Sequence, residues 1–269
     1  MEQIEIKEIS SDSDLQRCVF IQKEVWMHID EDVNPVHQFI VSLHTGGMLL
    51  GAYRNKKLIG FVYSFPAIHQ GKTVQHSHLL AVLPEYRGEK IGKRLKWAQL
   101  DWAVKNGYDL ITWTFDPLQA LNANLNLHTL GAKTYDYYFN FYGAIPSLML
   151  GKNIPTDRFL IEWRIKEKEV YDRKRGLYEQ YDVQAIPKAL FRNEHEKNDS
   201  LPAEPELSLK DRLILVEIPC RINNFSRSPD FIREWQKNLR KVMEHYISQG
   251  YQGEDFIAGK RCFYVLKKS

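Results

Sequence analysis

The stretch HSHLLAVLPEYRGEKIGKRL, residues 76–95, is the most informative part of this sequence. Its first residues suit a buried strand that ends near Val82, and its last residues suit a helix that begins near Lys90. A tight loop containing Gly88 joins the two. Basic residues crowd the start of the helix, at Arg87, Lys90, Lys93 and Arg94. Cations there oppose the helix dipole by roughly 0.3–1 kcal/mol each, and a bound polyphosphate would turn this cost into an attraction.

Two interpretations of this stretch are open from its pattern alone. The first is an anion site made by the unpaired N–H groups of the helix start. The second, which the pattern alone favours, is a solvated basic helix face after an ordinary turn. The motif GxxxxGK[ST] of a P-loop and the motif GxGxxG of a dinucleotide site are both absent.

The sequence on either side of this stretch alternates between strand-like and helix-like segments. Strands are predicted at residues 4–9, 48–54, 58–65, 73–82, 110–115, 134–141 and 159–165. Helices are predicted at residues 11–26, 35–44, 90–105 and 118–130. Further on, a strand at 212–218 precedes a helix with Ser228 as its cap and Pro229 at its first position, and a strand or hairpin follows at 256–266. This order predicts an α/β or α+β fold with a mixed central sheet flanked by helices and a C-terminal strand–helix–strand extension.

Composition shifts along the chain suggest three parts. Residues 1–165 are predicted to form the core, and residues 166–210 a charged surface connection, because residues 192–208 carry many charges and two prolines. Residues 211–269 are predicted to form an extension that packs on the core.

Charge and cysteine content exclude several classes of protein. The 37 basic and 34 acidic residues leave a net charge of only +3, which does not favour a nucleic-acid coat. The N-terminus carries acids where a signal peptide carries bases, and no apolar run could span a membrane. Cys18, Cys220 and Cys262 cannot all pair and show no CxxC spacing, which argues against a disulfide scaffold and favours a reducing cytosol. The motif HExxH is absent, which argues against a metal site, and the motif GxSxG is absent, which argues against hydrolase chemistry.

Residues 81–92, AVLPEYRGEKIG, resemble the acyl-CoA signature R/Q-x-x-G-x-G/A of the GNAT acetyltransferases. The resemblance covers about residues 4–143 as a whole fold. The segments WTFDPL at 113–118 and PTDRFL at 155–160 resemble a little-characterised bacterial GNAT subgroup of predicted acyltransferases, which extends the resemblance over most of the chain. One position departs from the signature, because its first glycine falls at Lys90; Gly88 is the nearest glycine that could supply the same flexibility.

The resemblance implies a binding site for acyl-CoA between the strand that ends at Val82 and the strand at 110–115. A β-bulge near residues 80–82 would splay these strands. The N–H of Leu80 or Val82 would polarise the thioester carbonyl, and Ala81 and Val82 would pair with the pantetheine arm. Lys93 and Arg94 would reach the 3′-phosphate. The implied cofactor-binding residues are Leu80, Ala81, Val82, Arg87, Gly88, Glu89, Lys90, Ile91, Gly92, Lys93 and Asn122.

The resemblance also implies a base that deprotonates the incoming amine. His76 lies where family members often place a carboxylate base, and His78 follows on the same strand face. Their alternative role is that of ordinary polar residues on a half-exposed strand. Asp116 and Asn122 are candidates to position a substrate ammonium or the pantetheine, and for Asp116-Pro117 turn chemistry is an equal alternative.

Other roles are assigned less directly. The tyrosine that protonates the CoA thiolate in many family members is replaced by Leu127, which leaves His128, Tyr137, Tyr138 or water as the acid. Arg54 or Arg158 is the expected unpaired base for a donor or acceptor carboxylate. The aromatic run at residues 135–142 is predicted to form one buried strand face rather than a binding wall.

The function expected from these residues is an acyl-CoA-dependent N-acyltransferase. It would use an acetyl or succinyl donor and transfer the acyl group directly to the amino group of a small molecule, with an amino acid among the candidates. Acetyl-CoA or another acyl-CoA is the expected cosubstrate, with no metal, no nucleic acid and no membrane. The protein is expected in the bacterial cytoplasm, and a homodimer through the C-terminal strands is compatible with the sequence. The alternatives are a catalytically silent acyl-CoA-binding module and, least favoured, a nucleic-acid binder.

Overall fold

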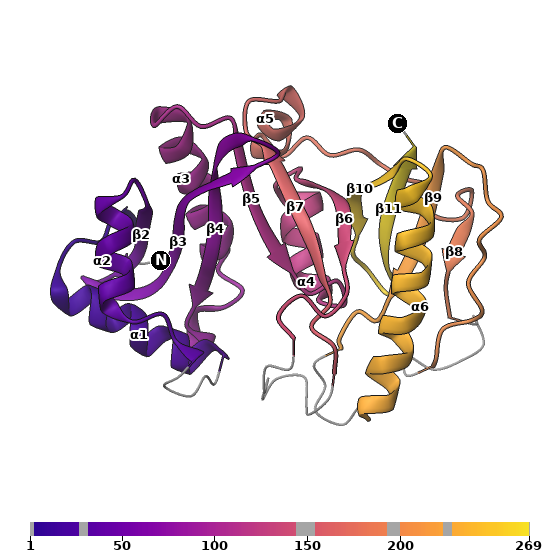
Figure 1. Cartoon of the computed structure of the whole chain (residues 1–269), viewed down its shortest axis with the longest axis horizontal. Coiled ribbons are helices and arrows are strands. Elements are labelled where there is room, and N and C mark those ends of the chain that lie inside the picture. The colour runs from indigo at the N-terminus through magenta and orange to yellow at the C-terminus, as the bar shows by residue number, and fades with distance from the viewer. Residues whose placement is uncertain (1–2, 27–31, 144–153, 193–199, 223–227, 269) are drawn as a thin grey trace. The chain divides into compact units, whose positions relative to one another are not determined.

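The computed structural model describes residues 3–26, 32–143, 154–192, 200–222 and 228–268. It divides into two compact units (Figure 1). The N-terminal unit contains Met1–Trp113 and Arg164–Lys166, and the C-terminal unit contains Thr114–Trp163 and Glu167–Ser269. The division falls inside a strand, whereas the sequence places its boundaries at residues 165 and 210; those boundaries stay a prediction.

The N-terminal unit is a mostly antiparallel sheet with helices on both faces. Its strands are β1 (Glu5–Glu8), β2 (Met48–Arg54), β3 (Lys57–His69), β4 (Lys72–Val82) and the part of β5 (Leu110–Phe115) that ends at Trp113. They lie in the order β1-β2-β3-β4-β5, and only the β4–β5 pair is parallel. The other elements are α1 (Asp12–Trp26), α2 (Val36–His44), the 3₁₀ turn η2 (Pro84–Tyr86) and α3 (Ile91–Lys105).

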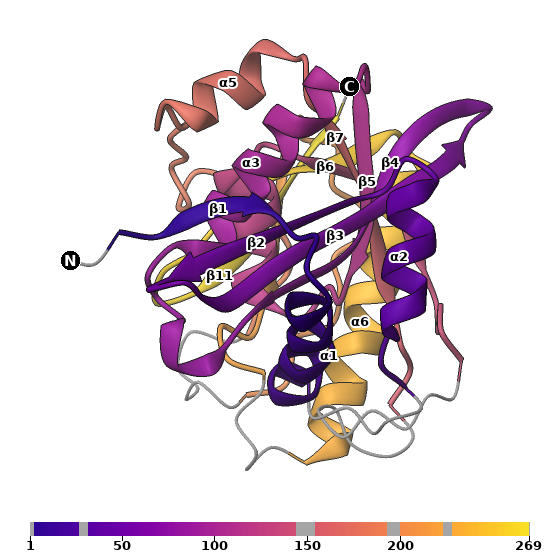
Figure 2. The same ribbon diagram turned by 90° about the vertical axis from the view of Figure 1, so that its left-hand side faces the viewer.

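Alternation along β2 and β3 explains why both faces of this sheet are covered. Leu49, Phe61 and Tyr63 point to the face of α1 and α2, where Phe39 is fully buried. Their neighbours along the strands, such as Leu50 and Val62, pack with Ile91 and Leu95 of α3. Figure 2 shows α1 and α2 on one side of β2 and β3, and α3 on the other. Apolar side chains on both faces give these strands their nearly continuous apolar sequence.

The hairpin of β3 and β4 is longer than predicted. Its pairing continues through Ala67↔Val74 to His69↔Lys72, and Gln70 and Gly71 close it with φ angles of +49° and +75°. Gly71 supplies a backbone conformation that is costly for other residues. The predicted loop between the two strands is therefore a two-residue turn.

The C-terminal unit is also built on mixed β-sheet. Its strands are β6 (Lys133–Tyr138), β7 (Arg158–Arg164, as far as Trp163), β8 (Lys188–Leu190), β9 (Leu213–Ile218), β10 (Tyr251–Ile257) and β11 (Cys262–Lys268). They lie in the order β7-β6-β10-β11-β9-β8, with antiparallel pairs apart from the parallel β8–β9 pair. The helices are α4 (Ala120–Ala123), α5 (Lys168–Lys174) and α6 (Pro229–Ser248), with a π-helical turn η3 (Asn124–Thr129) directly after α4.

The start of α6 confirms the cap that the sequence predicts. The Ser228 hydroxyl accepts a hydrogen bond from the Phe231 N–H at 3.3 Å, and Pro229 occupies the first helical position. Trp235, Leu239, Val242 and Tyr246 are buried, and α6 packs against β6, β8, β9 and β10. Figure 1 shows α6 running alongside the strands of this unit.

Two predictions about this unit are wrong. The single helix expected at 118–130 is the short α4 followed by the π turn η3. The strand expected at 134–141 ends at Tyr138, and Phe139 and Phe141 are 56% and 48% exposed, so the aromatic run does not form one buried face. The segment expected to be a surface connection contains α5 and β8, and its role as a connection stays a prediction; its residues 193–199 lie outside the described residues.

The cysteines also differ from expectation. Cys220, which follows β9, forms a disulfide with Cys262 at the start of β11, and Cys18 is the buried free cysteine of the described chain. Sequence spacing could not reveal this pair, because 42 residues separate its members. The cysteine count therefore no longer supports a reducing compartment. In the described part of the chain, no helix has the length and apolar character needed to cross a membrane.

Candidate functional site

The candidate site in the N-terminal unit begins where β4 and β5 separate. The two strands pair only at Gln75↔Ile111 and His76↔Thr112. On its other edge, β4 pairs Ser77 with Ser64 and Leu79 with Tyr63, so that His78 is an extra, bulged residue. The bulge was predicted near residues 80–82; it lies two residues earlier, directly after the last β4–β5 pair.

The backbone of β4 beyond the bulge has one free edge. The N–H of Leu83 donates to the carbonyl of Ile59 at 3.0 Å, and hydrogen-bonded pairs recur every second residue in an antiparallel ladder. Ala81 therefore bonds to β3 through its partner Phe61, while Leu80 and Val82 turn their N–H and C=O groups toward the edge that faces β5. The expected pairing of Ala81 with pantetheine is wrong at this point, since its backbone groups are already used.

A row of unpaired amides lies between β4 and α3. The N–H of Arg87 donates to the Pro84 carbonyl at 3.2 Å, and the next amide that is used is that of Arg94, which donates to Lys90 at 3.1 Å. Between them, the amides of residues 88–93 find no acceptor among the described residues. Unpaired N–H groups at a helix start are the usual protein ligands of a phosphate.

The backbone in this loop explains how the chain tolerates its departure from the signature. Lys90 is the N-cap of α3 and adopts φ +60° and ψ 19°, the left-handed conformation that glycine normally supplies. Gly88 has φ +86°. A Cβ placed on Gly92 would meet nothing nearer than the Leu80 side chain at 3.8 Å, so the surface over this amide is open.

Several side chains near the loop are engaged within the N-terminal unit. Arg54 forms an ion pair with Glu89 and lies 5.1 Å from the Tyr86 ring centroid. Arg94 donates to the Ile4 carbonyl at 2.6 Å. Arg54 is therefore not the unpaired base that was expected, and Arg94 is held away from a phosphate role. Arg87, Lys90 and Lys93 make no side-chain hydrogen bond or ion pair in the described structure.

The two histidines lie on the α1 and α2 face of β4. Their rings are 6.4 Å apart, and each lies within 5.6 Å of the Phe65 ring. His76 Nδ1 is 3.2 Å from the Thr112 hydroxyl. Burial, helped by the charges of His78 and Lys96, lowers the pKa of His76 to about 4, so its imidazole is neutral at pH 7.

His78 is held differently from His76. Asn34 Nδ2 donates to His78 Nε2 at 3.3 Å, so the lone pair of that nitrogen is in use. Burial lowers the pKa of His78 as well. Of the two rings, His76 is the one whose Nε2 makes no hydrogen bond with a described residue, although its basicity is reduced.

A buried lysine that the sequence did not predict lies on the other face of β4. Lys96 of α3 is 2% exposed, and its Nζ donates to the Ser77 hydroxyl at 3.1 Å and to Gln99 Oε1 at 2.6 Å. The same Nζ lies 3.7 Å from the centroid of the Trp113 ring of β5. Burial lowers the pKa of this amine well below its usual range. A lysine in a sequence normally indicates a solvent-facing position. The one feature of the sequence that pointed to burial of Lys96 was its place next to Leu95 on the apolar helix face.

The remaining sequence candidates belong to the C-terminal unit. Asp116 is 7% exposed and accepts hydrogen bonds from the Leu118 N–H and the Gln119 side chain, which is the turn chemistry that was its alternative role. Burial raises its pKa. Asn122 is exposed on α4. These two residues therefore lie in a different compact unit from the amide row and the histidines.

The candidate acids for the thiolate are also held by neighbours in the C-terminal unit. Tyr137 donates to Asp157 Oδ2 at 2.6 Å, and burial raises its pKa. His128 Nδ1 is 2.9 Å from Asp255 Oδ1, and its ring stacks on Tyr178. Leu127, at the position of the family tyrosine, is fully buried. In the described chain, no three His, Cys, Asp or Glu side chains are grouped so as to hold a metal ion.

Comparison with known proteins places this geometry in a family. Residues 10–131 match the family model described as the acetyltransferase (GNAT) family. Over these residues the chain belongs to the GNAT superfamily. The match contains the whole of β4, the amide row and α3, and it ends directly after η3.

Solved structures agree with a GNAT fold. The structure of yncA from Salmonella typhimurium with its cofactor acetyl-CoA has a TM-score of 0.51 and 13% identity, and the match covers 67% of this chain and 99% of that one. The ribosomal-protein-S18-alanine N-acetyltransferase from Escherichia coli has a TM-score of 0.48 and 16% identity, and the match covers 61% of this chain and 96% of that one. No curated protein matches the sequence. The family match and the yncA structure confirm a GNAT fold with a mixed, mostly antiparallel sheet flanked by helices.

Proposed function

We propose that this protein is an acyl-CoA-dependent N-acyltransferase that uses an acetyl or succinyl donor. It transfers the acyl group directly to the amino group of a small molecule, and an amino acid is the acceptor class we favour. Membership of the GNAT superfamily supports acetyl-CoA-dependent transfer as the type of chemistry. The observation that carries the proposal is the row of unpaired amides at residues 88–93.

The residues present fit the diphosphate of a coenzyme A thioester. The amides of Gly88, Glu89, Lys90, Ile91 and Gly92 converge at the start of α3, and the Arg87 and Lys93 side chains add positive charge without a partner among the described residues. Gly92 leaves its amide open to close approach. Arg87 is assigned by its side chain, because its own amide is bonded to Pro84.

The free edge of β4 supplies the groups for the rest of the cosubstrate. Leu80 and Val82 hold their N–H and C=O groups on that edge, beyond the last β4–β5 pair. We assign the Leu80 N–H to the thioester carbonyl, where a fixed donor stabilises the developing negative charge. Val82 is assigned to the pantetheine amides, and Ala81 contributes through its side chain only. Asn122 lies in the C-terminal unit, and its role in binding the cosubstrate stays a prediction from the sequence.

His76 is the proposed base. A primary amine is mostly protonated at pH 7 and must lose a proton before it attacks. The neutral His76 ring can accept this proton at Nε2, directly or through water, while Nδ1 donates to the Thr112 hydroxyl. His78 is assigned to orienting the acceptor together with His76. Asp116 remains a proposed positioning group for the ammonium.

The thiolate is proposed to take its proton from water. The family tyrosine is absent at Leu127, and Tyr137 already donates its hydroxyl proton to Asp157. We place the reaction in the cytoplasm of a bacterial cell, with a small amine as partner and neither nucleic acid nor membrane. A homodimer through the C-terminal strands is retained as part of the proposal.

A catalytically silent acyl-CoA-binding module is the second candidate. The lowered pKa of His76 favours it, because a base of pKa about 4 takes up a proton only weakly.

A thiol-release assay separates the two candidates. Acetyl-CoA and succinyl-CoA are each incubated with a panel of free amino acids and small amines, and release of CoA thiol is followed. Release should require the amine and should fall about a hundredfold in His76→Gln. The exposed His37 on α2 provides the matched control, and His37→Gln should keep full activity. Binding of both donors with no amine-dependent release from any pair would favour the silent module.

A further inference from the structure

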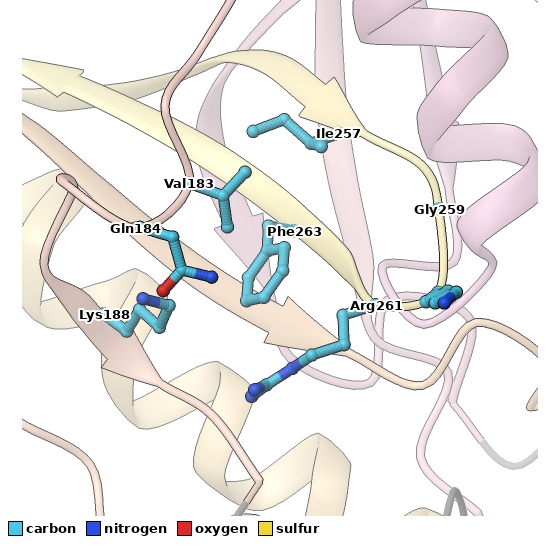
Figure 3. A pocket seen from close by; sticks show the side chains of 8 residues that line it. Val183, Gln184, Lys188, Ile257, Gly259, Arg261 and Phe263 are labelled. Atoms are coloured by element: carbon cyan, nitrogen blue, oxygen red, sulfur yellow. The ribbon is translucent and has the colours of Figure 1, made fainter. Parts of the chain in front are cut away.

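The C-terminal unit contains a cavity that the proposed transfer reaction does not use. Its volume is about 280 Å³, just below the range of roughly 300–1,000 Å³ of drug-sized ligand pockets, so it suits a small molecule. Figure 3 shows the side chains around it, which come from the segment before β8, from β8 itself, and from β10 and β11. The argument depends on Val183, Gln184, Lys188, Ile257, Arg261 and Phe263.

The floor of the cavity is apolar and firmly packed. Phe263 of β11 is 2% exposed and belongs to a core cluster with Leu215 and Val265, against which Val183 and Ile257 pack. Figure 3 shows the Phe263 ring next to the Val183 side chain. An aromatic or branched aliphatic group could therefore bury its surface here without rearranging the sheet.

The rim of the cavity carries an excess of positive charge. Arg192 and Arg261 both pair with the single carboxylate of Glu217, which is 1% exposed and lies opposite Phe263 in the β9–β11 ladder. Among the described residues that line the cavity, none is acidic, and Lys188 and Lys260 add further positive charge.

Lys188 is the group best placed to hold an anion. It lies on β8 and is only partly exposed, and its ammonium makes no hydrogen bond or ion pair with any described residue. Figure 3 shows its side chain beside Gln184 at one side of the cavity. A partly buried cation without a partner loses hydration, and a carboxylate would restore the lost interaction. The opposite side is anchored, since Arg261 precedes Cys262 of the disulfide.

We propose that this cavity binds a small amphipathic carboxylate. The apolar body of the ligand lies on Phe263 between Val183 and Ile257. Its carboxylate accepts hydrogen bonds from the Lys188 ammonium and the Gln184 amide, and the Arg261 guanidinium lies nearby. The site shares no residue with the amide row, the histidines or the other groups assigned to acyl transfer. It is therefore a second binding site, for an acidic metabolite with one apolar group.

Calorimetric titration of the full chain with three probes tests this site. Phenylacetate combines an apolar body with a carboxylate, phenylacetamide is its neutral analogue, and acetate has no apolar body. We expect saturable binding of phenylacetate, about tenfold weaker binding of phenylacetamide, and the weakest binding for acetate. Equal affinity for phenylacetate and phenylacetamide, or no saturable binding of phenylacetate, would overturn the proposal.

Two variants assign the binding to this cavity. Lys188→Met keeps an aliphatic stem and should weaken phenylacetate about tenfold while leaving phenylacetamide unchanged, which also shows that the cavity remains folded. Val183→Asp places a carboxylate in the wall and should weaken phenylacetate at least as much. Lys241→Met removes an exposed lysine of α6 and serves as the control that changes neither affinity. If Lys188→Met binds phenylacetate like the wild type, the carboxylate is not held here.

Discussion

His76 shows how one residue's environment can oppose its assigned role. The position places a histidine beside the strand opening, where an acyltransferase needs a base. Its surroundings, with the Phe65 ring, the positive Lys96 and a second histidine, all favour the neutral ring. A neutral ring can accept a proton, but it accepts one weakly when its pKa lies near 4.

The lowered pKa of His76 makes the stability of the N-terminal unit depend on pH. The unfolded chain holds a proton on this ring below about pH 6.5, whereas the folded chain takes it up only near pH 4. Above pH 6.5 the contribution of His76 to the free energy of unfolding therefore does not change with pH. As the pH drops to 4, this contribution lowers the free energy of unfolding by roughly 3 kcal/mol. Denaturant unfolding of the wild type and His76→Gln across this window measures the effect, and the difference between them should shrink as the pH rises. A difference that does not vary with pH would mean that the histidine titrates normally.

Residue types in the site were predictable from the sequence, but their partners were not. The chain from Leu80 to Lys93 was correctly recognised as strand, loop and helix start, because local pattern determines those elements. The pairing of Arg54 with Glu89 and of Arg94 with Ile4 joins residues far apart in sequence. No local pattern encodes such contacts, so the expectation that Arg54 and Arg94 are available to bind a ligand was wrong.

At the scale of elements, the strands and capped helices were the most predictable parts. Alternating apolar residues located β2, β3, β4 and β9 to within a few residues, and the Ser-Pro-Asp start located α6. The bulge at His78 and the π turn η3 were misplaced or missed, since each depends on how a segment packs rather than on its composition. The aromatic run failed for a related reason, because β6 stops before Phe139.

The disulfide is the strongest link between elements in the C-terminal unit. It joins the end of β9 to the start of β11 across 42 residues, and closing a loop of that length restricts the unfolded chain by about 4 kcal/mol. Cys220→Ser with Cys262→Ser should lower the free energy of unfolding by up to this amount, measured by chemical denaturation without reductant. Cys18→Ser keeps the disulfide, so added reductant should lower its free energy of unfolding as it does for the wild type, whereas the double variant should not respond to reductant.

The same pair tests the proposed compartment. Titration of thiols in protein taken rapidly from cells should find all three cysteines free if the protein works in a reducing cytoplasm. Finding only Cys18 reactive after unfolding would argue for an oxidising location and against the cytoplasmic proposal.

At the scale of the whole molecule, the GNAT match spans more than one compact unit. It runs from residue 10 to residue 131, and so includes the N-terminal unit from α1 to β5 as well as α4 and η3 of the C-terminal unit. The sequence predicted the fold class because motif and element order agree along this whole segment. It could not predict where the chain divides into units, since that depends on contacts between distant residues. The C-terminal unit adds further strands and a separate proposed ligand site.

The central claim is that the amides of residues 88–93 hold the diphosphate of coenzyme A. Calorimetric titration with CoA of the wild type and of Gly92→Ala tests it most directly, because the added methyl group contacts only Leu80 in the free protein and leaves the fold intact. Lys105→Met, in the last turn of the same helix, is the control. The wild type and the control should bind CoA alike, and Gly92→Ala should bind at least about tenfold more weakly at an unchanged melting temperature. Equal CoA affinity in Gly92→Ala, or no CoA binding by the wild type, would contradict the account.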